Sequence, residues 1–195
     1  ERDCQAAEQW RARLASARQR AQTTKDEHVR RWTVAGPFGL TCTQVVLGPQ
    51  HPDGLLPPER KLDLAAACTG EHGAKLVWKT VAAGADEYVN LESVCGKMDC
   101  SAAFAAACVY SPAKQTCRVT LGCECRTAVS INGQVAHLSS GNRPAYRNQE
   151  EFTVELSAGW NQILLRLMPV AARSGFYFRI AGEEQGLRFA LRPEE

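Results

Sequence analysis

The sequence lacks the features that mark several classes of protein. It has 195 residues and a net charge of +2, too weak a positive charge to imply nucleic-acid binding by itself. No run approaches the roughly 20 consecutive apolar residues of a membrane-spanning helix. Neither a Cys-x-x-Cys motif nor a Gly-rich phosphate loop occurs, so no thiol-redox site or nucleotide loop is predicted. We therefore expect no nucleic-acid partner, no membrane span and no cofactor.

Signatures of catalysis are also scarce. The Gly-x-Ser-x-Gly turn that carries the nucleophile of many hydrolases is absent. Two acids on predicted strands, Glu124 and Glu155, are expected to face solvent rather than to form the paired carboxylates of a glycoside hydrolase. The histidines all lie in polar or loop settings and are expected at the surface; they are His28, His51, His72 and His137. The sequence therefore predicts that the protein is not an enzyme.

Cysteine, in contrast, is abundant, with nine residues in the chain. In a secreted protein, most of these cysteines would pair in disulfides. In a reducing compartment, they would instead serve as small buried apolar side chains. The sequence leaves both interpretations open. It contains no duplicated close pairs of Cys or His of the kind that bind zinc, so no metal site is predicted.

Residues 117–167 show the clearest pattern of secondary structure. Apolar side chains recur at every second position in several short stretches, which places them on one face of a β-sheet; they are Cys117, Val119, Leu121, Cys123 and Cys125, then Val129 and Ile131, then Phe152, Val154 and Leu156, then Ile163, Leu165 and Leu167. Asn132-Gly133 between two such stretches is a strong hairpin signal, because both residues tolerate a positive φ. We predict antiparallel strands throughout this segment.

The first 31 residues differ from the rest. No Gly or Pro occurs before Gly36, and residues 3–31 are rich in the helix formers Ala, Arg, Gln and Glu. A narrow apolar stripe that includes Trp10 and Leu14 recurs every three or four residues. We predict a long N-terminal helix over residues 1–31, followed by a β domain over residues 32–195. The stripe is expected to pack on that domain or on a second copy, which would make a homo-oligomer.

Two further segments carry specific predictions. Residues 102–110 are rich in alanine, but their Cys-Val-Tyr ending before Ser-Pro favours a strand over a helix. If a tight turn centres on residues 112 and 113, antiparallel pairing places Cys108 opposite Cys117, close enough to bridge. This pair is therefore a candidate disulfide. Residues 48–60 hold four prolines and are predicted to form an irregular loop.

The order of these motifs resembles the galactose-binding-domain-like jelly roll, and in particular accessory modules of secreted bacterial proteins. The resemblance covers roughly residues 32–192 and rests on short motifs, which are Trp32-Thr-Val-Ala-Gly-Pro-Phe38, Pro57-Pro58-Glu59, Trp78-Lys79, Val129-Ser-Ile131-Asn-Gly133, Gly159-Trp-Asn161 and Gly175-Phe-Tyr-Phe-Arg-Ile180. It implies a mainly β antiparallel sandwich and an extracellular or periplasmic location. Such modules often carry an aspartate pair after a glycine, and in some related lectin-like domains an aspartate pair holds calcium. Here Cys123-Glu124-Cys125 follows Gly122, so no calcium is expected.

The polar loop of residues 137–149 is the best candidate for a binding site. It offers an aromatic ring, two guanidinium groups and an amide, from Arg143, Tyr146, Arg147 and Asn148. Such a set suits a sugar, whose C–H face stacks on a ring while its hydroxyls hydrogen-bond to planar polar groups. We predict a non-catalytic module that binds carbohydrate or a protein partner outside the cell or at its surface. The alternative is a structural subunit of a larger assembly.

Overall fold

The computed structural model describes residues 29–70, 73–96, 98, 101–141, 143–169, 174–182 and 186–193. These residues form a mainly β protein in which all paired strands are antiparallel. The helical segments are short and comprise α2 (Cys42–Leu47), η1 (Gly48–Gln50), η2 (Pro52–Gly54), α3 (Pro57–Arg60) and α4 (Glu92–Cys95). No helix in the described ranges has the length and apolar character needed to cross a membrane.

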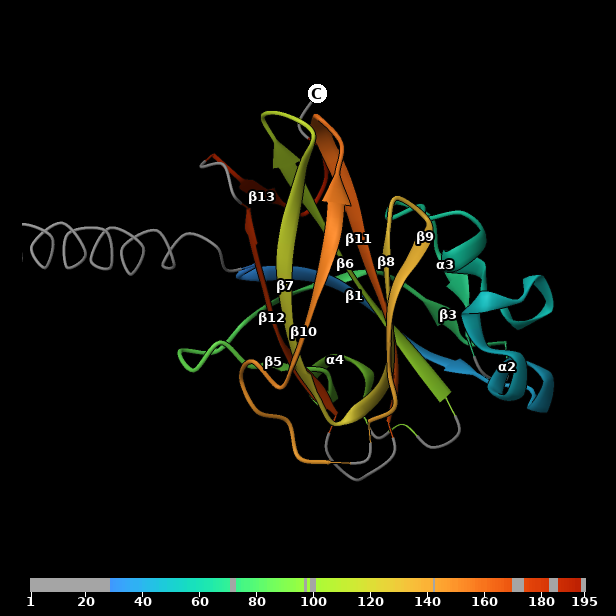
Figure 1. Cartoon of the computed structure of the whole chain (residues 1–195). Coiled ribbons are helices and arrows are strands. Elements are labelled where there is room, and N and C mark those ends of the chain that lie inside the picture. Colours follow the sequence, from blue (N-terminus) through green and yellow to red (C-terminus); the bar gives the residue numbers. More distant parts are fainter. Residues whose placement is uncertain are drawn as a thin grey trace, which may run out of the picture.

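Two sheets make up the body of the molecule (Figure 1). The larger has the order β4-β1-β6-β11-β8-β9, and β13 also pairs with β6; its strands are β1 (Arg31–Gly39), β4 (Lys79–Ala82), β6 (Ser101–Ser111), β8 (Cys125–Ile131), β9 (Gln134–Ser139), β11 (Gly159–Pro169) and β13 (Arg188–Ala190). The smaller has the order β10-β7-β12-β5, with strands β10 (Glu150–Leu156), β7 (Gln115–Cys123), β12 (Gly175–Gly182) and β5 (Val89–Asn90). A third pair joins β2 (Cys68–Thr69) to β3 (Lys75–Leu76).

The main hydrophobic core lies between the two sheets. Alternate residues of β7 and β12 face alternate residues of β8 and β11 across it, as the period of two predicts. Trp32 on β1 is fully buried there, and its ring meets the rings of Phe176 and Phe178 edge-on at 5.0 and 5.3 Å. The alternating pattern of residues 117–167 is therefore confirmed as the inner face of an antiparallel β structure.

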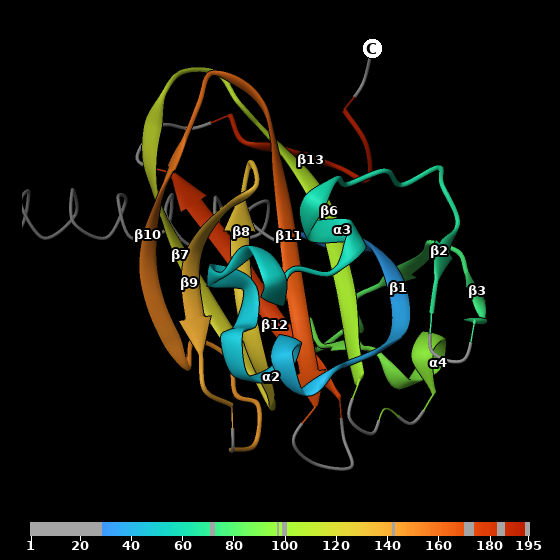
Figure 2. The same ribbon diagram turned by 90° about the vertical axis from the view of Figure 1, so that its right-hand side faces the viewer.

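The outer face of the larger sheet is covered as well. Figures 1 and 2 show the segment that carries α2, α3, β2 and β3 on the side of this sheet away from β7, β10 and β12. Beneath this segment, Phe38, Leu56 and Phe104 form a second apolar cluster with neighbouring side chains. Strand β6 is buried on both faces, which explains its alanines: Ala103 and Ala105 face the main core, and the small side chains let layers approach on either side. The predicted strand over residues 102–110 is confirmed.

A buried ion pair fastens this covering segment to the sheet. Arg166 of β11 is 1% exposed, and its guanidinium donates hydrogen bonds to the carbonyl oxygens of Gly54 at 2.9 Å and Gln44 at 3.1 Å. One of its nitrogens lies 3.3 Å from Oε2 of Glu59, which also accepts a 2.7 Å bond from the backbone N–H of Leu56. Burial raises the pKa of Glu59 even with this cation beside it. One arginine thus holds three parts of the covering segment.

The predicted Asn132-Gly133 hairpin joins β8 to β9. Asn132 and Gly133 have φ values of 51° and 80°, as a primed turn requires. Asn161, which is fully buried, accepts a 2.8 Å hydrogen bond from Nδ2 of Asn132 and a 2.9 Å bond from the backbone N–H of Ser157. Asn132 and Asn161 therefore have a structural role, because their hydrogen bonds stabilise the β8–β9 turn and the turn between β10 and β11.

The predicted fold class was wrong in its long N-terminal helix. Among the described residues, Val29 and Arg30 are not helical, and Arg31 already begins strand β1. Residues 1–28, which carry the rest of that predicted helix and its apolar stripe, lie outside the described residues. The longest continuous helical stretch in the described ranges is the short run formed by α2 and η1. The predicted irregular loop over residues 48–60 also contains η2 and α3, where prolines occupy the first helical turns.

The predicted register between Cys108 and Cys117 was also wrong. Strands β6 and β7 belong to different sheets, so the connection between them crosses from one layer to the other instead of forming a hairpin. Across the ladders, Cys108 is opposite Gln162 and Ala190, whereas Cys117 is opposite Val154 and Gly182. Cys108 is a buried free thiol. No disulfide joins the two positions. The predicted register required β6 and β7 to be neighbours in one sheet, which they are not.

Candidate functional site

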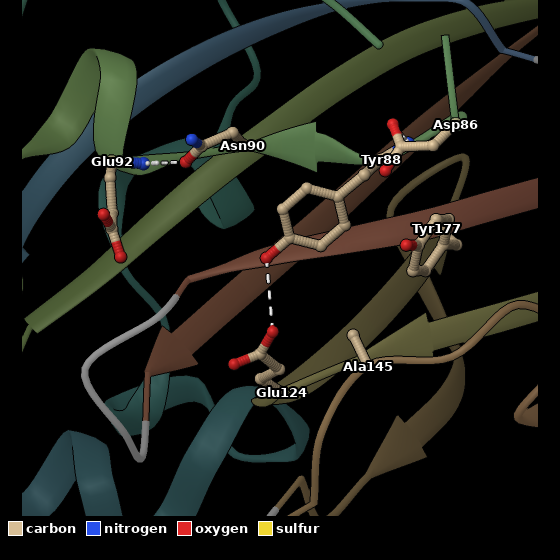
Figure 3. Close-up of a pocket in the computed structure, with 7 residues that line it drawn as sticks. All are labelled: Asp86, Tyr88, Asn90, Glu92, Glu124, Ala145 and Tyr177. Atoms are coloured by element: carbon tan, nitrogen blue, oxygen red, sulfur yellow. Dashed lines mark hydrogen bonds between the residues drawn. The ribbon is translucent and has the colours of Figure 1, made fainter. Parts of the chain in front are cut away.

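A pocket of about 360 Å³ opens at one end of the smaller sheet. It is lined by residues from four separate parts of the chain, namely Asp86, Tyr88, Asn90 and Glu92 around β5, Glu124 between β7 and β8, Ala145 of the loop between β9 and β10, and Tyr177 of β12. Figure 3 shows these side chains gathered around the ring of Tyr88. The volume lies toward the lower end of the range of about 300–1,000 Å³ for small-molecule sites, so the pocket suits a small ligand or one group of a larger one.

Two tyrosines provide the aromatic part of the pocket. The rings of Tyr88 and Tyr177 lie 5.2 Å apart at their centres, with an angle of 56° between their planes. The hydroxyl of Tyr88 donates a 3.3 Å hydrogen bond to Oε1 of Glu124. Burial, and then the negative charge of Glu124, raise the pKa of Tyr88. Tyr88 is therefore a neutral phenol at physiological pH, half-buried and fixed in direction by its carboxylate partner.

The turn that presents Tyr88 contains a residue in an unusual conformation. Glu87 has a φ of 74°, which is rare for a residue other than glycine. Its carboxylate is held by Arg179 of β12 in two hydrogen bonds of 2.8 and 2.9 Å, and Nε of Arg147 lies 3.5 Å away. Arg147 also donates to the carbonyl oxygen of Asp86, at 3.0 Å from Nε. This clamp of Glu87, Arg147 and Arg179 joins the turn to both the sheet and the β9–β10 loop.

Two glycines allow the walls of the pocket to approach the sheet. A Cβ added to Gly175 would lie 2.2 Å from the ring of Tyr88, so this tyrosine rests directly on the backbone of β12. A Cβ added to Gly122 would lie 1.7 Å from the carbonyl oxygen of Tyr146, so the β9–β10 loop rests in the same way on β7. Gln149 fastens the loop by accepting a 3.0 Å hydrogen bond from the backbone N–H of Cys123.

The structure separates the four residues predicted to bind a ligand. Arg147 belongs to the clamp beside the pocket, and its guanidinium carbon lies 5.9 Å from the centre of the Tyr177 ring. Tyr146 is 63% exposed and does not line the pocket, although the neighbouring Ala145 does. Arg143 is directed to Glu150, and Asn148 is exposed with a φ of 55°. The loop is thus one wall of the pocket, while its role in binding stays a prediction.

A second polar cluster joins this loop to strands β9 and β10. Glu150 is its centre: Oε2 lies 2.6 Å from Nε2 of His137, and Oε1 accepts hydrogen bonds from Ser139, at 2.7 Å, and from Arg143. The ring of His137 stacks on Phe152 at 4.1 Å between centres, so this histidine is not the exposed surface residue that was predicted. Because the carboxylate stands between serine and histidine, the histidine cannot activate the serine as in a hydrolase triad.

This cluster makes stability dependent on pH. Burial works against ionisation, but hydrogen bonds from His137 and Ser139 and the charges of His137 and Arg143 hold the pKa of Glu150 below its ordinary value. A carboxyl with a lowered folded-state pKa stabilises the fold above its unfolded-state pKa of about 4.3, and the stabilisation is lost as pH falls through the folded value. We therefore expect Glu150→Gln to flatten the fall in stability between neutral pH and acid.

Urea unfolding at a series of pH values measures this effect. The matched control is Glu151→Gln on the same strand, because the Glu151 side chain is 59% exposed and lies 3.7 Å from Arg118 in an exposed pair. The control should follow the parent curve. Identical pH slopes for the parent and Glu150→Gln would show that this carboxyl has no stabilising partners.

The buried cysteines serve as apolar side chains rather than as nucleophiles. Burial raises the pKa of Cys95 and of Cys108 to about 11 and that of Cys125 to about 12, so these groups stay protonated thiols at neutral pH. Cys42, by contrast, is exposed on α2. Within the described ranges, no group of three His, Cys, Asp or Glu residues is arranged to hold a metal ion.

Comparisons with known proteins place the chain in no family. No protein-family model matches it, and no curated protein matches it in sequence. Two crystal structures of β-glucosidase from Kluyveromyces marxianus show partial likeness. The complex with glucose has a TM-score of 0.42 and 11% identity over 78% of this chain and 17% of that chain. The selenomethionine-labelled form has a TM-score of 0.42 and 9% identity over 62% of this chain and 16% of that chain.

The chain therefore spans less than a fifth of the length of the β-glucosidase chains that it matches. At this TM-score and identity, the likeness decides neither the fold family nor the activity of this chain.

Proposed function

We propose that the protein is a non-catalytic binding module that uses the Tyr88–Tyr177 pocket to recognise carbohydrate, or a protein partner, at the cell surface or outside the cell. The observation that carries this proposal is the pairing of two tyrosine rings, 5.2 Å apart, with carboxylate and amide oxygens around one concave site. A sugar presents C–H groups that pack on aromatic rings and hydroxyls that donate to such oxygens. The pocket offers both kinds of contact.

A binding role fits the lining residues better than a catalytic one. The phenol of Tyr88 is protonated and already donates to Glu124, so neither partner is an activated nucleophile. No histidine, cysteine or serine is among the residues that line the described pocket. The resemblance of the motif order to galactose-binding-domain-like accessory modules of secreted bacterial proteins supports the same proposal, as does the position of the β9–β10 loop beside the pocket.

A glycan array followed by titration tests the proposal. We expect Tyr177→Ala to weaken binding of any glycan that the parent protein recognises by about tenfold, because the substitution removes one aromatic wall. Tyr146→Ala is the matched comparison, since Tyr146 is exposed and lies outside the lining. Loss of binding in Tyr146→Ala alone would show that the ligand binds at the exposed loop and not in the pocket. Unchanged binding in Tyr177→Ala would contradict the proposal that the ligand binds in the pocket.

The alternative function, a structural subunit of a larger assembly, has one observation in its favour. None of the α2 residues is buried, and Val46 on this helix is 80% exposed beside partly exposed Val45 and Leu47. An apolar surface of this kind is typical of a contact with another protein. Sedimentation of the full chain separates the two proposals, because an assembly subunit should associate at low concentration whereas a binding module need not.

A further inference from the structure

The pocket carries an excess of negative charge. Asp86, Glu92 and Glu124 all line it, and none of the three forms an ion pair within the described residues. Two of them accept hydrogen bonds from Tyr88: Asp86 from its backbone N–H at 3.2 Å, and Glu124 from its hydroxyl at 3.3 Å. Neither contact neutralises a charge.

The arginines closest to the pocket do not cancel this charge. Nη2 of Arg179 donates to both carboxylate oxygens of Glu87, at 2.9 and 2.8 Å, and Nε of Arg179 lies 3.3 Å from Oε2. Nε of Arg147 lies 3.5 Å from the same carboxylate. Counting this clamp with the lining, four carboxylates are opposed by two guanidiniums, an excess of two negative charges. A concave site lined by one sign of charge attracts ligands of the opposite sign.

The aromatic rings point to the same kind of ligand independently of the carboxylates. The face of a tyrosine ring is electron-rich and attracts an ammonium group placed within about 6 Å of its centre. Tyr88 and Tyr177 stand at 56° to one another, so two ring surfaces border one space. In Figure 3 the hydroxyl end of Tyr88 points to the carboxylate of Glu124, while Glu92 lies farther off on another side of the pocket. An ammonium group beside Glu124 would therefore meet carboxylate oxygens and aromatic surface together.

From these contacts we propose that the pocket selects ligands with a protonated primary amine, and that its carbohydrate ligand is an amino sugar with a free amino group. This inference rests on the proposed function and narrows it. Glu124 accepts a hydrogen bond from the ammonium group, Glu92 and Asp86 add negative charge to the pocket, and the tyrosine rings contact the C–H face of the sugar. N-acetylation removes both the charge and two of the donors, so it should weaken binding.

Isothermal titration with three probes of equal length tests the inference: a β-1,4-glucosamine oligomer, its N-acetylated form and a cello-oligosaccharide. Below the pKa of the sugar amine, the glucosamine oligomer should bind about tenfold more tightly than either neutral probe. Added salt should reduce this preference, because the pocket is open to solvent. Glu124→Gln should remove most of the preference and Glu92→Gln should reduce it, whereas Glu155→Gln, in an exposed pair with Lys114, should keep it.

The possible outcomes separate the inference from the proposed function. Equal affinity for all three probes, lost in Tyr177→Ala, would overturn the charge preference while the carbohydrate site stands. A preference that survives both pocket substitutions, or that Glu155→Gln removes equally, would show nonspecific attraction by the whole protein and overturn the inference. Absence of binding to every probe, with the glycan array also blank, would overturn both. Circular dichroism of each variant guards against loss of folding.

Discussion

Replacing Arg166 with alanine should lower the free energy of unfolding by about 3–5 kcal/mol, the usual cost of removing one partner of a buried ion pair. The substitution leaves the carboxylate of Glu59 buried, and it deprives the carbonyl oxygens of Gly54 and Gln44 of their donors. The carboxylate and the two carbonyl oxygens therefore stay buried without the hydrogen bonds and the opposite charge that offset the loss of water. The urea midpoint should therefore fall markedly, and the segment containing α2, η2 and α3 should become sensitive to proteases.

Two further variants separate charge from packing. Arg118→Ala removes an arginine whose side chain is 62% exposed in a surface pair with Glu151, and it should change stability by less than about 1 kcal/mol. The double variant Arg166→Met with Glu59→Leu replaces the buried pair by apolar groups and should recover much of the loss. If Arg166→Ala were as mild as Arg118→Ala, the guanidinium would not be the attachment of the covering segment.

Gly122→Ala should displace the β9–β10 loop and impair the pocket. The new methyl group would have to occupy space within 1.7 Å of the carbonyl oxygen of Tyr146, and a backbone atom cannot rotate out of the way as a side chain can. Overpacking of this kind costs about 1–3 kcal/mol. Because Ala145 is a wall of the pocket, ligand affinity should fall together with stability. Urea unfolding and glycan titration measure the two effects.

Gly133→Ala gives the contrast for this prediction. Gly133 has a φ of 80° but open space around the position of a Cβ, so alanine there costs about 1–2 kcal/mol through backbone strain alone. It lies in the β8–β9 turn, away from the pocket residues, and should leave ligand affinity unchanged. Equal loss of affinity in both variants would mean that global destabilisation, rather than displacement of the loop, causes the effect.

The strands were predictable from the sequence where one face of a sheet is buried. Val119, Leu121 and their neighbours alternate cleanly, because β7 has a core face and a solvent face. The two-sided burial of β6 hid its period, since Ala103 faces the main core while Phe104 faces the outer cluster. Alanine at such positions reflects close packing of layers, and helix propensity alone would have suggested the wrong element.

The pairing of strands was less predictable. Three residues, 112–114, join β6 to β7, and short connections usually join neighbouring strands. Here Ser111 is buried and its hydroxyl donates to the carbonyl oxygen of Ala113 at 2.7 Å, while Nε2 of Gln115 donates to the Ser111 hydroxyl at 2.7 Å. This local network turns the chain from one sheet into the other. The prediction that Cys108 lies opposite Cys117 was wrong because the amino-acid sequence has no periodic pattern that reveals side-chain hydrogen bonds of this kind.

Only one wall of the candidate site was anticipated. The β9–β10 loop stood out by its polar composition, but most of the pocket comes from Tyr88, Glu124 and Tyr177. Each of these has buried neighbours along its own strand or turn, such as Val89 beside Tyr88 and Phe176 beside Tyr177. For Tyr177, the available signal was a tyrosine directed outward between two buried phenylalanines, Phe176 and Phe178. Their convergence depends on the sheet order β7-β12-β5, which no local spacing encodes.

The assembly of the pocket from four distant parts of the chain links ligand binding to folding. A ligand that contacts the β5 region, the β7–β8 corner and β12 can bind only when all of them are in place. The unfolded chain has no binding site for such a ligand. Binding of the ligand therefore raises the free energy of unfolding, and this stabilisation grows with ligand concentration. The temperature of unfolding of the intact protein is therefore a reporter of occupancy, and it can rank candidate sugars without a label or a catalytic readout.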